Sequence, residues 1–196
     1  MGYFGLRSPV FIKRGIFWIK PDIYLIIDEM HAKAAHTYSQ YFNFSPNGEL
    51  KIRECGTVAD FIAPSAHAYI KTLAANTVFT QHDSLYSDHY NDMIKTKGLK
   101  TSFKAKAGTN AVTVIVANAN GKYENIKVEK APVLSDDRKT AVSENEALGI
   151  IIDLDGDAHT VVLTFRETMK VLFCNEKHAA AKITWYNKNE HHNVLW

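Results

Sequence analysis

Histidine and aspartate side chains, which can bind metals and carry protons, are most concentrated in one segment near the middle of the chain. This segment contains His82, Asp83, Asp88, His89 and Asp92. Imidazole nitrogen and carboxylate oxygen are ligands for zinc and calcium, but the spacing matches no defined metal-binding loop and no glycine shapes the turn. We therefore predict a hydrated, hydrogen-bonded surface here and no metal site in this chain.

A second acidic cluster, residues 153–157 with the sequence DLDGD, superficially resembles half of a calcium-binding loop. A loop of the EF-hand type needs a glutamate six residues after its glycine and a helix on each side. Val162 occupies that position here, and the flanking residues favour strands. Because Asp-Gly between β-type segments favours a tight turn, we predict a hairpin that joins residues 148–154 to residues 159–166.

Sequence motifs for nucleophilic catalysis are absent from the chain. It contains no G-x-S-x-G elbow, and neither an H-E-x-x-H motif nor a glycine-rich phosphate loop. Cys55 and Cys174 lie far apart and outside any C-x-x-C motif, and neither has an adjacent histidine that would activate the thiol. One long-range disulfide and two buried free thiols are both consistent with this spacing.

The elements that position these residues are predicted to be strands, beginning with residues 13–30. Two apolar runs rich in β-forming residues flank Lys20-Pro21-Asp22, and proline and aspartate favour a tight turn. Trp18 and Ile16 share one face of the first run, and we expect both side chains to lie in the core.

Apolar and polar residues alternate with a period of two almost throughout the chain, which indicates half-buried strands. The further strands predicted on this basis are residues 36–44, 58–62, 68–73, 99–107, 111–117, 123–129, 148–154, 159–166, 171–174 and 182–186. Asn118–Gly121 is predicted to be a hairpin turn. Residues 131–146 are predicted to form an exposed loop or a short helix. Residues 187–196 are predicted to fray or to continue into a further tail. We therefore predict an all-β protein, a large antiparallel β-sandwich of the supersandwich type that forms a single domain over residues 1–196.

The composition is that of an ordinary globular domain, with 46% hydrophobic and 22% charged residues. A net charge of +2 is too small to indicate a nucleic-acid partner. No apolar run approaches the roughly 20 residues that a membrane helix needs, and no signal peptide is recognisable. We expect neither nucleic acid nor a membrane as a partner.

The segment KRGIFWIKPDIYLIIDEM, residues 13–30, resembles the start of the C-terminal β-domain of heparinase II/III-like polysaccharide lyases. Tyr86, Ser87 and Tyr90 match an element of that family in which an aromatic residue and the sequence S-x-x-Y are separated by one residue or none, and AHTYSQYFNF, residues 35–44, resembles another of its segments. The resemblance covers residues 13–116. Asn43 and Ile12 stand where relatives often have histidine.

The resemblance implies a part in the β-elimination of uronate-containing polysaccharides. That reaction neutralises a carboxylate, removes the neighbouring proton and protonates the leaving oxygen. In the family these groups come mainly from an N-terminal α-helical toroid and from the first β-strands, which would precede Met1. The resemblance therefore implies the C-terminal β-sandwich of a secreted or periplasmic bacterial lyase that acts on glycosaminoglycans or other acidic polysaccharides, with a helical domain in cis. It also implies that this chain holds no cofactor, that any divalent metal is bound by upstream residues, and that the chain is inactive alone.

No catalytic residue is predicted within this chain. The candidate residues for contact with the polysaccharide are Arg14, His36, Tyr86, Ser87, His89 and Tyr90. Tyrosine rings can stack on sugars, but the rings of Tyr86 and Tyr90 fit a purely structural role as well. The alternative function is that of an autonomous carbohydrate-binding or interaction β-sandwich without catalysis.

Overall fold

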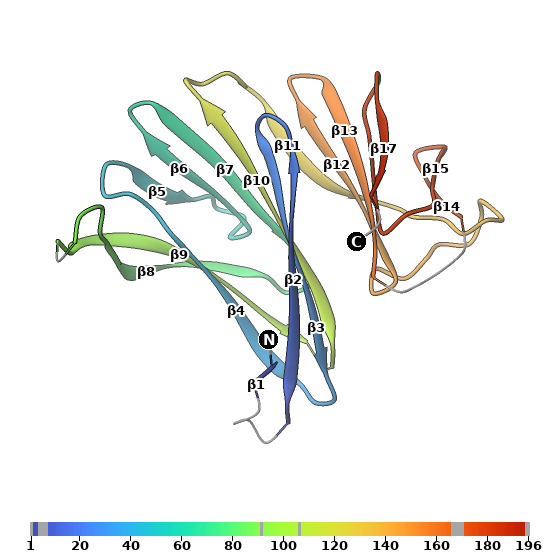
Figure 1. Ribbon diagram of the computed structural model, residues 1–196, viewed down its shortest axis with the longest axis horizontal. Helices are drawn as coiled ribbons and strands as arrows, with labels where there is room; N and C mark the ends of the chain where they lie inside the picture. The colour runs from blue at the N-terminus through green and yellow to red at the C-terminus, as the bar shows by residue number, and fades with distance from the viewer. Residues whose placement is uncertain (1, 4–7, 91, 106, 166–170, 195–196) are drawn as a thin grey trace. The chain divides into compact units, whose positions relative to one another are not determined.

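The computed structural model describes residues 2–3, 8–90, 92–105, 107–165 and 171–194. The secondary-structure elements in these residues are all β-strands, and every pair of neighbouring strands is antiparallel (Figure 1). The predicted all-β, antiparallel sandwich is therefore confirmed. The chain divides into two compact units, Met1–Lys122 and Tyr123–Trp196, which are described separately.

The first unit contains a seven-stranded sheet with the order β1-β2-β3-β10-β7-β6-β5. Its strands are β1 (Gly2–Tyr3), β2 (Val10–Ile19), β3 (Ile23–Ala32), β5 (Glu49–Ile52), β6 (Val58–Ala63), β7 (Ala66–Leu73) and β10 (Thr109–Ala119). The predicted first hairpin is confirmed, since β2 pairs with β3 and Ile19 lies opposite Ile23. The Lys20–Pro21 peptide bond in its turn is cis.

A three-stranded sheet with the order β4-β9-β8 forms the other layer of this unit. Its strands are β4 (His36–Asn43), β8 (Val78–Tyr86) and β9 (Ile94–Ala105). Alternate residues of β4 and β9 face the larger sheet, because successive side chains of a strand point to opposite faces. Tyr38 and Phe103 thereby pack against Val10, Met30 and Ala111 of the larger sheet. A second cluster between the two sheets contains Leu50, Ala59, Ile70, Phe79 and Leu99.

The expectation that Trp18 and Ile16 are core residues is wrong. Their exposed fractions are 48% and 69%. The indole N–H donates to the Pro21 carbonyl oxygen at 3.0 Å, and the ring stacks on Tyr24. Apolar residues on a strand indicate a sheet face that can be buried, but they do not indicate how far the second layer extends over that face. Here the second layer covers Val10, at the opposite end of β2 from Trp18.

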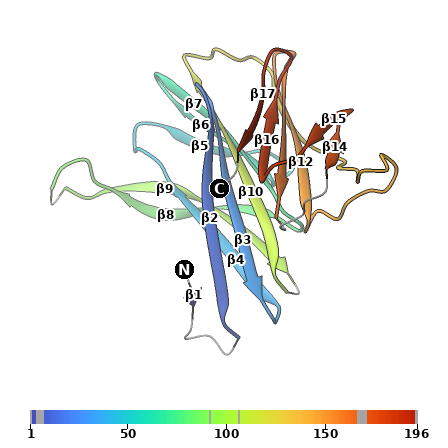
Figure 2. The ribbon, with the colours of Figure 1, turned by 45° about the vertical axis from the view of Figure 1, so that its right-hand side comes forward.

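The second unit contains a five-stranded sheet with the order β11-β12-β13-β16-β17 and a separate β14-β15 pair. Its strands are labelled in Figures 1 and 2 taken together. Its strands are β11 (Ile126–Ala131), β12 (Ala147–Leu154), β13 (Asp157–Thr164), β14 (Leu172–Cys174), β15 (Lys177–Ala179), β16 (Ile183–Tyr186) and β17 (His191–Val194). The segment between β11 and β12 is a loop stabilised by isolated bridges. The core includes Val133, Val162, Leu172, Cys174 and Tyr186.

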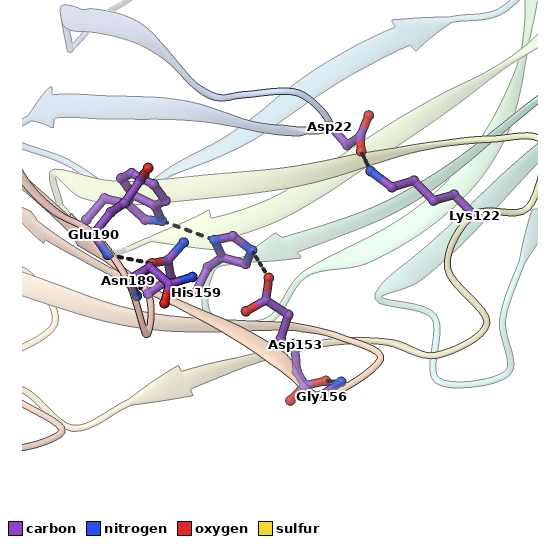
Figure 3. A network of polar contacts seen from close by, with 10 residues as sticks. Asp22, Lys122, Asp153, Gly156, His159, Asn189 and Glu190 are labelled. Atoms are coloured by element: carbon purple, nitrogen blue, oxygen red, sulfur yellow. Dashed lines mark hydrogen bonds and ion pairs between the residues drawn. The ribbon is translucent and has the colours of Figure 1, made fainter.

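The predicted Asp-Gly hairpin is confirmed, as β12 and β13 pair around Asp155 and Gly156, which both have positive φ. The backbone N–H of Gly156 donates to the Asp153 carboxylate at 2.8 Å (Figure 3). Arg166, the last residue of the predicted second strand, lies outside the described residues.

Two expectations about turns and ends were wrong. Asn118–Gly121 does form a turn, in which Asn120 and Gly121 have positive φ, but it does not close a hairpin. The strand before it pairs with β3 and β7, whereas the strand after it pairs with β12. The expected fraying is contradicted for residues 191–194, which form β17 and pair with β16; residues 195 and 196 lie outside the described residues.

Candidate functional site

A cavity of about 700 Å³ lies in the first unit, between the larger sheet and β4. It is lined by Val10, Ile12, Arg14, Asp28, Met30, His36, Thr37, Tyr38, Ser39, Gln40, Tyr41 and Phe103. Half of these residues are apolar or aromatic, and the other half are polar or charged. Apolar and aromatic side chains with convergent polar groups are typical of small-molecule sites in proteins, and we therefore treat the cavity as the candidate binding site.

The polar centre of the cavity is a bidentate ion pair between Arg14 and Asp28. The guanidinium Nε and Nη2 atoms each lie 2.6 Å from one carboxylate oxygen. The two residues face each other across β2 and β3. The Arg14 side chain is 51% exposed, whereas the Asp28 side chain is 4% exposed. The Asp28 carboxylate is thus buried within the protein, and its two hydrogen bonds hold the Arg14 guanidinium at the cavity wall in one orientation.

A chain of hydrogen bonds continues from Asp28 into the second layer. The Gln40 side-chain amide on β4 donates to the Asp28 carboxylate at 2.9 Å. The Thr113 hydroxyl on β10 donates to the Gln40 oxygen at 3.0 Å, and lies 2.8 Å from the Thr72 hydroxyl on β7. The network therefore joins both sheets through buried polar groups, which cost little once each is hydrogen-bonded.

His36 and Tyr38 form the wall of the cavity on β4. The His36 Nε2 atom and the Tyr38 hydroxyl are both buried and have no hydrogen-bond partner. The Tyr38 ring stacks on Phe103 at a centroid distance of 5.7 Å, and burial raises the pKa of its hydroxyl. Tyr38 is therefore a packing residue with a neutral hydroxyl, and it is poorly suited to act as a proton-abstracting base.

The structure brings Arg14 and His36 to one cavity but places the other predicted contact residues elsewhere. Tyr86 ends β8, and Ser87, His89 and Tyr90 follow it in the β8–β9 connection. The Ser87 hydroxyl donates to the His89 carbonyl oxygen at 2.7 Å, and the Tyr90 side chain is 96% exposed.

Strand pairing separates these two groups along β9. His36 lies opposite Ala105, whereas Tyr86 lies opposite Ile94 at the other end of the strand. A strand rises about 3.3 Å per residue, so the two positions are roughly 36 Å apart. Figures 1 and 2 show the end of the β8–β9 hairpin extending away from β2 and β3. One small ligand therefore cannot contact both groups.

The His and Asp residues near this hairpin make separate pair interactions. Asp83 pairs with Lys97 at 2.5 Å, and the Asp88 carboxylate lies 3.0 Å from His89 Nδ1. In the described part of the chain, no three His, Cys, Asp or Glu side chains come together as a group that could hold a metal.

The two cysteines are free thiols in this structure. Cys174 is buried in the second unit, where burial raises its pKa, and its carbonyl oxygen accepts a hydrogen bond from the Tyr186 hydroxyl. Cys55 is exposed. The sequence left open a disulfide or two buried free thiols; the structure shows neither, because both thiols are free and only Cys174 is buried.

The sequence analysis missed the residues that organise the cavity, Asp28 and Gln40. Asp28 stands at the end of the apolar run of β3, and Gln40 stands on the inward-facing side of β4 between Tyr38 and Phe42. A polar residue at an inward-facing strand position needs a buried partner, and that was the available signal. Which residue becomes that partner depends on how the two sheets pack together, and the pattern of a single strand does not predict this packing.

Comparisons with known proteins bear on the fold. No family model and no curated protein sequence matches the chain. Among solved structures, heparan sulfate lyase HepC from Pedobacter heparinus is similar with a TM-score of 0.62 and 13% identity, over 86% of this chain and 28% of that chain.

A mutant of the same lyase is similar with a TM-score of 0.62 and 13% identity over 82% of this chain and 26% of that chain. A heparinase III gene product has a TM-score of 0.57 and 14% identity over 83% of this chain and 25% of that chain. The chain thus spans about a quarter of the length of these proteins. At such low identity, the likeness shows that this chain has the fold of a β-region of these lyases.

Proposed function

We propose that this chain is the C-terminal β-sandwich of a heparinase II/III-like polysaccharide lyase, and that the Arg14 cavity contacts the acidic polysaccharide. The observation that carries the proposal is the fixed Arg14 guanidinium in a cavity of about 700 Å³, within a fold similar to that of heparan sulfate lyases. Acidic polysaccharides carry carboxylates or sulfates, and a preoriented guanidinium binds such groups with charge-assisted hydrogen bonds.

The buried Asp28 carboxylate is compatible with an anionic ligand because it is neutralised locally. Arg14 and Gln40 donate hydrogen bonds to both of its oxygens. An unpaired carboxylate at this position would repel a uronate, whereas the ion pair leaves a polar wall without net charge. The pairing with Asp28 weakens the long-range attraction of Arg14 for an anion, although its guanidinium remains a charged hydrogen-bond donor. We therefore expect only weak binding by this chain alone, of millimolar order or about −4 kcal/mol.

We further propose that the chain does not catalyse elimination by itself, and that an α-helical domain in cis completes the site. Among the described residues that line the cavity, the Arg14 cation is tied to Asp28 and the Tyr38 hydroxyl is buried. A separate proton-abstracting base, a leaving-group acid and a carboxylate-neutralising group are not assembled there. We also propose, from the resemblance to heparinase II/III-like lyases alone, a secreted or periplasmic location for the full-length lyase. Separately, the described residues include no helix that is both long and apolar enough to cross a membrane.

The binding test is an NMR titration of the chain with oligosaccharides derived from heparan sulfate. We expect perturbed resonances for residues around Arg14 and Asp28, and an Arg14→Gln variant that loses most of the response. Arg53→Gln is the matched control, because Arg53 forms a bidentate pair with Asp60 and is similarly exposed, at 50%. A loss that occurs equally in both variants would attribute the effect to general charge or stability and contradict the assignment.

A second outcome separates this function from the alternative of an autonomous binding module. Submicromolar binding, or perturbations confined to the β12–β13 hairpin, would favour the autonomous module.

Elimination produces an unsaturated uronate with ultraviolet absorbance, so the proposal that the chain is inactive alone is tested by incubation with heparan sulfate, chondroitin sulfate and alginate. We expect no rise in absorbance, and sustained turnover by the purified chain would contradict the proposal.

A further inference from the structure

The cavity wall on β2 continues as an exposed aromatic surface beyond Arg14. Arg14, Ile16 and Trp18 occupy alternate positions of a strand whose pairing with β3 is regular from Val10 to Ile19. Their side chains therefore lie on one face of the sheet. The opposing residues on β3 are Asp28, Ile26 and Tyr24, so the Asp28 ion pair and the Trp18–Tyr24 ring pair belong to one continuous surface.

The Trp18–Tyr24 pair is held in place although it is exposed. The two rings are stacked with centroids 5.6 Å apart and planes 7° apart. The indole N–H donates to the Pro21 carbonyl oxygen at 3.0 Å, which fixes the ring edge. A large aromatic surface that is fixed before binding loses little conformational entropy when a ligand stacks on it. Half of Trp18 nevertheless remains exposed, at 48%, which is unusual for so large an aromatic residue.

A positive charge accompanies the rings. The Lys20 ammonium lies 5.1 Å from the centroid of the Trp18 ring, and the Lys20 side chain is exposed. Sugar rings present C–H faces to aromatic rings as other apolar groups do, and the exposed Lys20 ammonium, which lies over the Trp18 ring, can pair with a carboxylate or sulfate of the same sugar. The combination of a fixed ring pair and an adjacent cation favours an acidic saccharide over an apolar protein segment.

We propose that Trp18, Tyr24 and Lys20 form a second saccharide subsite that continues the Arg14 cavity. This proposal rests on the proposed function, because its ligand is another unit of the same acidic polysaccharide chain. Trp18 follows Arg14 by four residue steps along the strand, a distance of about 13 Å at 3.3 Å per residue. A short saccharide in the cavity would not reach the ring pair, whereas a longer oligosaccharide would contact both places.

The test compares two ligands by NMR, a disaccharide and an octasaccharide derived from heparan sulfate. We expect the disaccharide to perturb resonances around Arg14, and only the octasaccharide to perturb the Trp18 indole N–H as well. The indole N–H of Trp185, which donates to His159 in the second unit, serves as the internal control and should not shift.

Three variants test the contribution of each group. Trp18→Ala should weaken octasaccharide binding roughly two- to tenfold, the scale of an aromatic contact, and leave disaccharide binding unchanged. Trp18→Phe should restore most of the loss, since a ring remains on Tyr24. Lys20→Gln should weaken octasaccharide binding more at low than at high salt, because salt screens exposed charges. Phe11→Ala is the matched control, since Phe11 is similarly exposed, at 49%, but lies on the opposite face of β2 and does not line the cavity.

The possible failures are distinguishable. If the disaccharide perturbs the Arg14 cavity while Trp18→Ala leaves octasaccharide binding unchanged, the second subsite is wrong and the proposed function stands. If neither ligand perturbs the wild-type chain, the proposed function fails as well. If the Trp18 resonance moves with protein concentration but not with the saccharide, the ring pair contacts a second copy of the chain and the subsite is wrong.

Discussion

The Gln40 side chain on one sheet donates a hydrogen bond to the buried Asp28 carboxylate on the other, at 2.9 Å. This is the bond through which the Arg14 ion pair reaches the second layer of the first unit. It also leaves the Gln40 oxygen to accept from Thr113. The orientation of Arg14 at the cavity wall therefore depends on the contact between the two sheets as well as on the pairing of β2 with β3.

Replacing Gln40 by leucine should destabilise the chain by about 1–3 kcal/mol, because the Asp28 carboxylate loses a buried donor. Ser39→Ala is the control on the same strand: its exposed hydroxyl lies 3.1 Å from the Ser102 hydroxyl, and its loss should change stability by less than about 0.5 kcal/mol. Urea unfolding of the three proteins measures both values. Equal stability of Gln40→Leu and the wild type would show that the bond between the sheets contributes nothing.

Trp18→Ala should cost less than about 1 kcal/mol of stability, since its side chain is half exposed and lies outside the core clusters. Phe103→Ala, by contrast, removes a ring that is 3% exposed and stacked on Tyr38, and should cost about 3–5 kcal/mol. Thermal unfolding monitored by circular dichroism measures the two losses. A Trp18→Ala loss as large as that of Phe103→Ala would mean that the indole is part of the core.

The strands could be predicted from the sequence wherever the alternation of apolar residues was clear. The β2–β3 and β12–β13 hairpins were predicted because tight turns join adjacent segments that pair with each other. Asn118–Gly121 has the same turn chemistry but joins strands of different sheets. Turn residues fix the local backbone alone, whereas pairing also depends on which distant strand offers a complementary edge.

The site could be predicted only in part. Arg14 and His36 were identified and do share a cavity, but Tyr86 and its neighbours were grouped with them although they lie at the other end of β9. A sequence motif gives only the order of residues along the chain. In a three-stranded sheet, residues on neighbouring strands can lie opposite distant positions of the same strand, as His36 and Tyr86 do on β9. Strand register, which the sequence did not reveal, decides which of them meet.

The Asp60 carboxylate should make the first unit sensitive to acid. Burial opposes its ionisation, but hydrogen bonds from Arg53 and His67 outweigh that effect, and the pKa of Asp60 is lowered. A carboxyl whose pKa is lower in the folded than in the unfolded chain contributes stability above its unfolded value of about 4 and loses that contribution as pH falls further. Urea unfolding at pH 7 and pH 3 should therefore show a smaller acid loss for Asp60→Asn than for the wild type. An identical acid loss would contradict the assignment.

The His159 imidazole should give the second unit its own acid sensitivity at a higher pH. Burial lowers the pKa of His159, although Asp157 and Glu190 partly oppose this shift. Its Nδ1 atom accepts the indole N–H of Trp185 at 3.3 Å, and the two rings are stacked with His192 on the other side of the indole. Only the unprotonated Nδ1 can accept this bond, so the folded state favours the neutral imidazole.

The sign of the resulting pH dependence follows from the lowered value. Above the unfolded pKa of about 6.5, His159 is neutral in both states and causes no loss. As pH falls below 6.5, the unfolded chain binds a proton more readily than the folded chain, and stability declines until the folded imidazole is protonated as well. Unfolding at pH 7.5 and pH 5 should therefore show a loss in the wild type that His159→Gln reduces. His178→Gln is the control, since the His178 ring contacts His191 but not Trp185. A reduction of the same size in His178→Gln would contradict the prediction, because general histidine protonation, rather than the bond to Trp185, would then cause the loss of stability.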